Sequence, residues 1–300
     1  MAEILIGTSG YDYPEWKGVF YPDDLKRKDF LSYYAGVFNA LELNNTFYNM
    51  PTADRLMSFY ERSDGRLKFS IKANRMLTHE IRGEWKSDSK IFIDAVSPLA
   101  QKDSLCSILF QFPQSFHYTK ENRIYLSDLI NEFKGFPVVI EFRHVEWIRE
   151  SVLEGLESRG AALCYCDMPE LKYLPNNALK SIEVVEPVET TSETTPAIFY
   201  LRLHGRNGEN WYSNNTSAPG TPHVLDTSPS VRYTYNYTDA ELREFTPIIT
   251  QAVITGKKPI VFFNNHPNGS GARNAVKLKE MLKLPRKSAE IHYNDGVLIS

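Results

Sequence analysis

The sequence predicts an α/β fold, a single-domain (β/α)8 barrel, and three observations support this prediction. Short apolar or β-branched runs recur eight times along the 300 residues. Most gaps between the runs contain one helical pattern, and strand–helix alternation implies right-handed crossovers and a parallel sheet. Eight such units fit a closed barrel better than an open doubly wound sheet, although the spacing alone does not exclude the open sheet. We therefore assign residues 1–300 to one barrel domain.

The expected elements follow in chain order. The eight strands are residues 4–8, 40–43, 68–73, 107–111, 138–142, 162–166, 198–203 and 260–264. Helical periodicity is visible around residues 56–60 and 124–133. Thr238 and Glu241 have the spacing of a capping box that opens another helix. We expect the last helix to begin near Ala272.

Two segments interrupt the repeat. Residues 175–196 are acidic and Thr-rich, so we expect an exposed insertion between the sixth and seventh strands. Residues 205–237 follow the seventh strand and are rich in Gly, Asn, Pro and Tyr. Long loops of this kind in compact domains are often lids or binding loops.

Composition narrows the functional class. The net charge of −3 and the pI of about 6.2 provide no global basic field for nucleic acid. The three cysteines do not indicate a disulfide framework, and we expect Cys164 and Cys166 to be small core residues on opposite faces of their strand. There is no secretory signal and no run of about 18 apolar residues. The sequence thus predicts a cytoplasmic protein with no membrane partner.

The polar residues gather where the strands end, which is where barrel active sites lie. Alternate strand residues share a face. Glu141 and Arg143 therefore point the same way, whereas Ile140 and Phe142 point the other way, and the other strands repeat this pattern. We expect the polar set to face the barrel interior and its mouth and the apolar set to face the helices. A purely structural ion-pair network is the alternative interpretation.

The mixture of cations and carboxylates favours an enzyme that binds a small anionic or phosphorylated substrate and uses Glu and His for acid–base chemistry. We predict Glu42, Glu141 and His204 as the catalytic residues. The predicted substrate-binding residues are Asn44, Lys72, Gln111, Arg143, Arg202, Arg206, Trp211, Asn264, Asn265, Gly269 and Gly271. The two glycines belong to a loop that we expect to receive phosphate at the start of the last helix.

Two other functions remain open. Glu42, Glu141, Asp167, His204 and His266 include the ligand types of a metal-dependent phosphoesterase or isomerase. Lys and Arg side chains among them oppose a cation, so we assign no metal ligands and expect no cofactor, with a divalent metal as the alternative. A non-catalytic module that binds a nucleotide or a single strand through an aromatic-lined mouth is the other possibility. The sequence does not indicate the oligomeric state.

The order of these motifs resembles the YecE-like family, domain of unknown function 72. The matching runs include Ile6-Gly7-Thr8-Ser9-Gly10, Glu42-Leu43-Asn44-Asn45-Thr46-Phe47-Tyr48, Glu141-Phe142-Arg143-His144, Arg202-Leu203-His204-Gly205-Arg206 and Phe263-Asn264-Asn265. Tyr11 departs from the pattern, because a Trp is usual there. The resemblance implies a (β/α)8 barrel, broadly similar to xylose isomerase-like and endonuclease IV-like barrels. It implies no settled activity.

Overall fold

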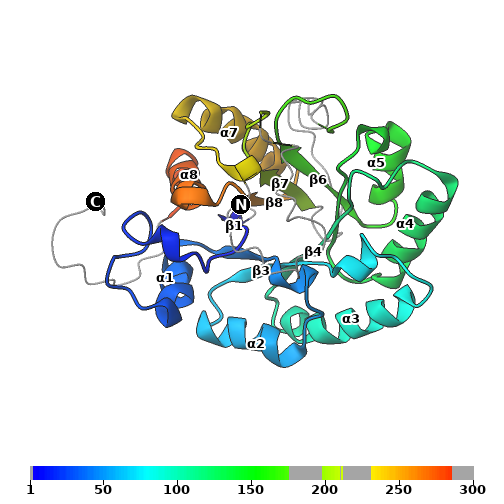
Figure 1. Cartoon of the computed structure of the whole chain (residues 1–300), viewed down its shortest axis with the longest axis horizontal. Coiled ribbons are helices and arrows are strands. Elements are labelled where there is room, and N and C mark those ends of the chain that lie inside the picture. The colour runs from blue at the N-terminus through cyan, green and yellow to red at the C-terminus, as the bar shows by residue number, and fades with distance from the viewer. Residues whose placement is uncertain (1–2, 176–197, 210, 212–230, 286–300) are drawn as a thin grey trace, which may run out of the picture.

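The computed structural model describes residues 3–175, 198–209, 211 and 231–285 (Figure 1). Eight parallel strands form one sheet in the order β1-β8-β7-β6-β5-β4-β3-β2, and the helices surround it. The strands are β1 (Leu5–Thr8), β2 (Ala40–Leu43), β3 (Lys68–Lys72), β4 (Leu105–Gln111), β5 (Val138–Glu141), β6 (Ala162–Asp167), β7 (Ile198–Leu203) and β8 (Lys258–Phe263). The predicted (β/α)8 barrel is confirmed, and every strand overlaps its predicted range.

The described residues contain α1 (Phe30–Val37), α2 (Ala53–Arg62), α3 (Trp85–Gln101), α4 (Lys120–Glu132), α5 (Glu150–Glu157), α7 (Asp239–Ile254) and α8 (Ser270–Met281). The predicted capping box is present, because the Thr238 side chain accepts from the Glu241 amide while the Glu241 side chain accepts from the Thr238 amide. Helix α8 begins at Ser270, two residues before the predicted start. Nearly all of the insertion at 175–196, and residues 210 and 212–230 of the long loop, lie outside the described residues.

The core has two apolar layers, one on each side of the sheet. The outer layer packs Leu41, Ile140 and Leu201 against helical residues such as Leu31 and Leu129. A second cluster fills the barrel interior and includes Leu5, Ala40, Leu109, Val139, Ile260 and Phe262. The predicted alternation of faces is thus confirmed. None of the helices in the described residues is long and apolar enough to cross a membrane.

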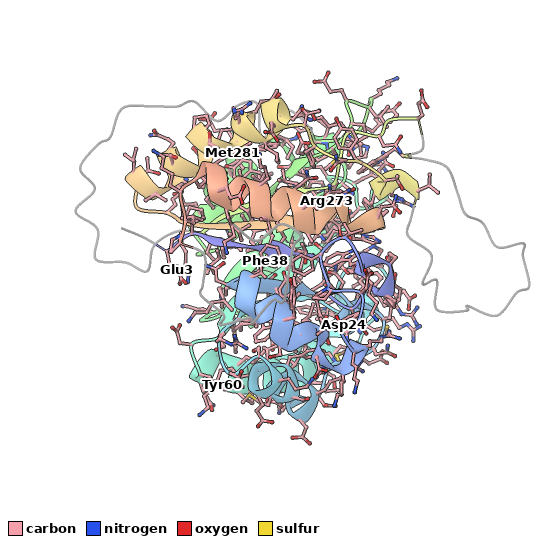
Figure 2. All side chains as sticks on the ribbon, turned by 90° about the vertical axis from the view of Figure 1, so that its left-hand side faces the viewer. Glu3, Asp24, Phe38, Tyr60, Arg273 and Met281 are labelled. Carbon is pink, nitrogen blue, oxygen red and sulfur yellow. The ribbon has the colours of Figure 1, made fainter. Side chains whose placement is uncertain are left out.

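The barrel closes between β1 and β2, where the ladder shortens to one parallel bridge between Ser9 and Glu42. The Gly10 amide donates to the Glu42 carbonyl at 2.9 Å. On the outside, α8 lies beside α1 with Phe38 between them (Figure 2). The Lys279 ammonium donates to the Val37 carbonyl and so ties the two helices together.

A tyrosine and a glycine make this seam possible. The Tyr34 hydroxyl accepts from the Thr8 amide at 2.8 Å and donates to the Ala40 carbonyl at 3.0 Å, so it replaces a missing ladder contact. A Cβ on Gly7 would lie only 1.9 Å from the Ala40 carbonyl oxygen. Only glycine lets the two strands approach this closely.

The predicted placement of two cysteines is wrong. The sulfur atoms of Cys164 and Cys166 lie 3.8 Å apart, and both side chains are buried in the barrel interior. Residues two apart in a strand share a face, because the side-chain period is two. Both thiols are free, as is that of Cys106, so the absence of a disulfide framework is confirmed for all three cysteines.

Candidate functional site

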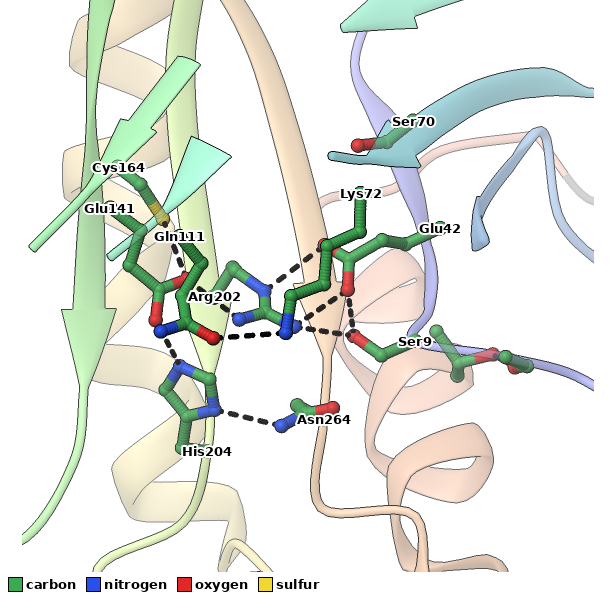
Figure 3. A network of polar contacts seen from close by, with 12 residues as sticks. Ser9, Glu42, Ser70, Lys72, Gln111, Glu141, Cys164, Arg202, His204 and Asn264 are labelled. Carbon is green, nitrogen blue, oxygen red and sulfur yellow. Dashed lines mark hydrogen bonds and ion pairs between the residues drawn. The ribbon is translucent and has the colours of Figure 1, made fainter. Parts of the chain in front are cut away.

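A buried arginine joins two carboxylates at the C-terminal ends of the strands (Figure 3). Arg202 of β7 donates to Glu42 of β2 through Nη2 at 2.6 Å and Nε at 3.0 Å. Its Nη1 donates to Glu141 of β5 at 2.6 Å. Arg202 is 2% exposed and both carboxylates are fully buried. Three strands that are far apart in the chain are therefore linked by one guanidinium.

The two carboxylates have further donors. Glu42 accepts from the Ser9 hydroxyl at 2.6 Å and from the Tyr200 hydroxyl at 2.8 Å. Arg143 donates through Nε to the second oxygen of Glu141. Burial raises the pKa of Glu141, but the guanidinium groups of Arg143 and Arg202 outweigh burial and bring this pKa well below its usual value. Glu141 is therefore ionised throughout the physiological range.

A chain of hydroxyls extends from this network into the barrel. Ser107 donates to Ser70 at 2.7 Å, Ser70 and Tyr200 share a bond of 2.7 Å, and Tyr200 donates to Glu42. The sequence prediction omitted these three residues. Each stands on the inward face of its strand, at even spacing from the predicted Lys72, Gln111 or Arg202. The strand alternation that led to Lys72, Gln111 and Arg202 would therefore also have predicted these three hydroxyl residues.

Lys72 differs from Arg143 and Arg202 because it has no carboxylate partner among the described residues. Its Nζ donates to the Gln111 side chain at 2.9 Å and lies 4.4 Å from the centre of the Phe47 ring. Within the described residues, Lys72 forms no ion pair. Burial lowers its pKa to about 7, and the nearby charge of Arg202 acts in the same direction.

His204 continues the network toward β8. Its Nε2 lies 3.3 Å from Arg143 Nη2 and 3.6 Å from a Glu141 oxygen, and its Nδ1 lies 2.9 Å from the Asn264 amide. Burial and the charge of Arg143 lower the pKa of His204 to about 3. The imidazole is therefore neutral at physiological pH.

Trp211 forms a wall of the site. It is 3% exposed. The Arg143 guanidinium lies 5.9 Å from its ring centre, and its ring packs edge-on against His204 and Tyr233. The covered ring therefore supports Arg143 and His204 and does not present an open platform for a base.

Arg206 lies in a separate cluster. It donates to both oxygens of Asp167, with the shorter contact at 3.0 Å, and to Glu244 at 2.7 Å. Burial raises the pKa of Asp167, although Arg206 and the Tyr237 hydroxyl oppose this effect. Gly205 has φ 89°, so the chain turns just after β7 and Arg206 does not continue the side-chain alternation of that strand.

The predicted phosphate loop packs against the first loop of the barrel. Gly269 is the N-cap of α8, its amide donates to the His266 carbonyl at 3.2 Å, and a Cβ there would lie 2.7 Å from Val19. A Cβ on Gly271 would lie 3.3 Å from the Asn265 carbonyl. Asn265 itself donates to the Tyr235 carbonyl and to the Asn274 side chain, both at 2.9 Å. These contacts place Asn265 and Gly269 in a packed turn and Gly271 in the first turn of α8.

Two residues border the Lys72 side of the mouth. The side-chain oxygen of Asn44 is buried and has no hydrogen-bond partner among the described residues. His79 was not in our prediction; its ring packs edge-on against Phe47 at 4.8 Å, and burial and the charge of Lys72 lower its pKa to about 4. Its position in the loop between β3 and α3, at the C-terminal end of the barrel, was the available signal.

One group of possible metal ligands lies inside this network. The ligand atoms of Glu141, Cys166 and His204 lie within 4.8 Å of one another. Both oxygens of Glu141 already accept from Arg143 or Arg202. A cation placed there would face two guanidinium groups, so the local electrostatics disfavour this group as a metal centre.

Comparison with known proteins places this barrel in a family. The UPF0759 protein YunF of Bacillus subtilis (strain 168) is 27% identical over 290 residues, which are 94% of this chain and 95% of that protein. A crystal structure of a DUF72 family protein from Thermotoga maritima MSB8 is 31% identical, has a TM-score of 0.75 and covers 93% of this chain and 99% of that one.

A second solved structure, a DUF72 family protein from Enterococcus faecalis V583, has a TM-score of 0.73 at 21% identity. It covers 99% of this chain and 100% of that chain and supports the fold. The family model described as "Protein of unknown function DUF72" matches residues 5–294, almost the whole chain. With the barrel and its motifs in agreement, the chain belongs to the DUF72 family.

Proposed function

We propose that this protein is an enzyme that binds a small anionic substrate, such as a phosphorylated metabolite, at the C-terminal mouth of the barrel. The charge balance of the network carries this proposal. Lys72, Arg143 and Arg202 provide three cations, whereas Glu42 and Glu141 provide two carboxylates. Because His204 is neutral, one positive charge remains, on the side of Lys72. An anionic substrate group would balance it.

Lys72 is the group best suited to proton transfer. General acid–base catalysis works best when the pKa of the group lies near the working pH, and the pKa of Lys72 is lowered to about 7. The predicted catalytic residues Glu42 and Glu141 each accept several donors and would serve as anchors for the arginines. His204 would hold Arg143 in place. This division of roles replaces the one that the sequence favoured.

The remaining polar residues would orient the substrate. Gln111 holds Lys72, and Asn264 holds His204. Asn44 presents a buried oxygen that has no donor in the described part of the chain. An unsatisfied buried acceptor costs about 1–3 kcal/mol, so a hydroxyl or amine of the substrate that donated to it would recover this free energy.

A second candidate reaction rests on the same lysine. An amine that is partly uncharged near neutral pH is a nucleophile toward carbonyl carbons. Attack of Lys72 Nζ on a ketone or aldehyde would form a carbinolamine, and loss of water from this adduct would form an imine. Borohydride reduction in the presence of glyoxylate, followed by mass spectrometry, distinguishes the two roles. An adduct on the Lys72 peptide supports the nucleophile, and an unmodified peptide supports proton transfer alone.

The experiment that tests the binding site is a thermal-shift screen of small phosphates and carboxylates. A ligand at a hundredfold its Kd adds about 2.7 kcal/mol of stability. We expect Lys72→Met to lose most of the stabilisation that a hit gives the unsubstituted protein. Lys68→Met is the matched control, because Lys68 lies at the other end of β3 and pairs with Asp103. Equal stabilisation of both variants by every hit would refute the proposed site.

A further inference from the structure

A second group of side chains lies at the same end of the barrel, outside the Arg202 network. His117 lies between β4 and α4, and His144 and Glu146 follow β5. One ring nitrogen of each histidine and a carboxylate oxygen of Glu146 lie within 4.8 Å of one another. We propose that His117, His144 and Glu146 form a binding site for a divalent transition metal of the Zn²⁺ class.

The spacing of the ligand atoms fits such an ion. Glu146 Oε2 lies 3.2 Å from His117 Nδ1 and 3.6 Å from His144 Nδ1. In a tetrahedral site with bonds of 2.0–2.1 Å, ligand atoms are about 3.3–3.4 Å apart. The third pair consists of the two imidazole nitrogens, which lie within 4.8 Å of each other. A rotation of the partly exposed His117 side chain would bring them to the same separation. Two imidazoles and one carboxylate are a ligand set that suits zinc and its neighbours better than Mg²⁺ or Ca²⁺.

The charge around this cluster also favours a cation, in contrast to the Glu141 network. Within the described residues, the ion pairs of the Glu146 carboxylate involve only the two imidazoles. Glu146 Oε2 also accepts from the Tyr118 amide at 3.2 Å, and no arginine in the described part of the chain pairs with it. The side chains of His117 and Glu146 are 53% and 42% exposed, so water or another ligand can complete the coordination.

The loop after β4 and the loop after β5 are tied together beside the cluster. The Trp147 indole donates to the Phe116 carbonyl at 2.6 Å, and the two rings stack at 5.2 Å. These residues directly adjoin Glu146 and His117. The Glu146 amide donates to His144 Nδ1 at 3.3 Å and holds this ring beside the cluster, and a metal ion would take the place of this hydrogen bond on the single lone pair of Nδ1. The ligands are thus largely positioned before any ion binds.

The test uses the full chain without an affinity tag, stripped by a chelator and then titrated with Zn²⁺ or Co²⁺. We expect one ion per chain and visible Co²⁺ absorption bands typical of tetrahedral coordination. His117→Ala and Glu146→Gln should each weaken Zn²⁺ binding by at least about tenfold, since even the loss of an outer-shell partner has an effect of this size. Both side chains are partly exposed, so thermal melting should show that both variants remain folded.

His79→Ala and Glu150→Gln are the matched controls. They remove an imidazole and an exposed carboxylate that both lie outside the cluster. Retained binding in these controls together with loss in the two cluster variants supports the site. Three results overturn it: no Zn²⁺ binding, binding that both cluster variants retain, or an equal loss in the controls.

Discussion

Lys68 and Lys72 illustrate how position decides the chemistry of a side chain. Both belong to β3 and both point to the same side of the strand. Lys68 pairs with Asp103 at 2.8 Å on the far end of the barrel. Lys72 lies among the arginines of the mouth, where burial and Arg202 lower its pKa to about 7. Its ammonium is the most readily deprotonated cation of the network, because Arg side chains remain charged.

The pH dependence of Lys72 labelling tests this difference. A neutral amine reacts with acetic anhydride, whereas an ammonium does not. The labelling rate of Lys72 should therefore rise with pH and reach half its maximum near pH 7, in contrast to about pH 10.4 for an ordinary lysine. Bound inorganic phosphate should move this midpoint upward, because an anion favours the charged form. Mass spectrometry of labelled peptides gives the midpoint, and a value near 10 would contradict the low pKa.

At the scale of elements, the seam between β1 and β2 is the weakest part of the sheet. A single bridge, one tyrosine hydroxyl and the close approach at Gly7 replace a regular ladder. Ser9 and Glu42 belong to both the seam and the site, since Ser9 donates to the Glu42 carboxylate. The residues that close the barrel between β1 and β2 therefore also help to form the candidate site.

Gly7→Ala should lower the free energy of unfolding by at least about 3 kcal/mol, the upper end of the range for overpacked cores, because the added methyl group meets a backbone oxygen. Gly155→Ala in α5 is the control, because its new methyl group would be 3.7 Å from the nearest atom, at the end of a flexible arginine. It should raise stability by about 0.5–1 kcal/mol through helix propensity. Urea unfolding measures both, and equal effects of the two substitutions would argue against the steric explanation.

At the scale of the whole molecule, Arg202 connects β2, β5 and β7 across the barrel interior. Buried ion pairs often add little to stability compared with apolar residues, yet the removal of one partner is costly because a buried charge remains. The network therefore fixes the relative positions of the strands more than it stabilises the fold.

Glu42→Gln should lower the free energy of unfolding by about 3 kcal/mol, because Arg202 keeps its charge and loses one of its two carboxylates. Glu15→Gln, on an exposed residue of the first loop, should change it by less than about 0.5 kcal/mol. Chemical denaturation of the two variants gives the comparison. A Glu42→Gln protein as stable as the control would mean that solvent reaches Arg202 in solution.

The sequence by itself determined the eight strands and the direction of their side chains. Both follow from local geometry, because a strand alternates its side chains with a period of two. This is why Glu42, Lys72, Glu141 and Arg202 were correctly placed at the interior and mouth. The same rule would have found Ser70 and Tyr200. The rule does not extend to Arg206, because the positive φ of Gly205 turns the chain after β7.

Only the tertiary structure decided which charges meet and which remain unmatched. Arg202 pairs with carboxylates 160 and 61 residues away in the chain, and Arg206 joins Asp167 and Glu244. Among the described residues, these pairings leave Lys72 without a carboxylate and bring His117 beside Glu146. The physical reason is that Coulomb energies and desolvation depend on distances and burial across the barrel, which no local sequence pattern contains.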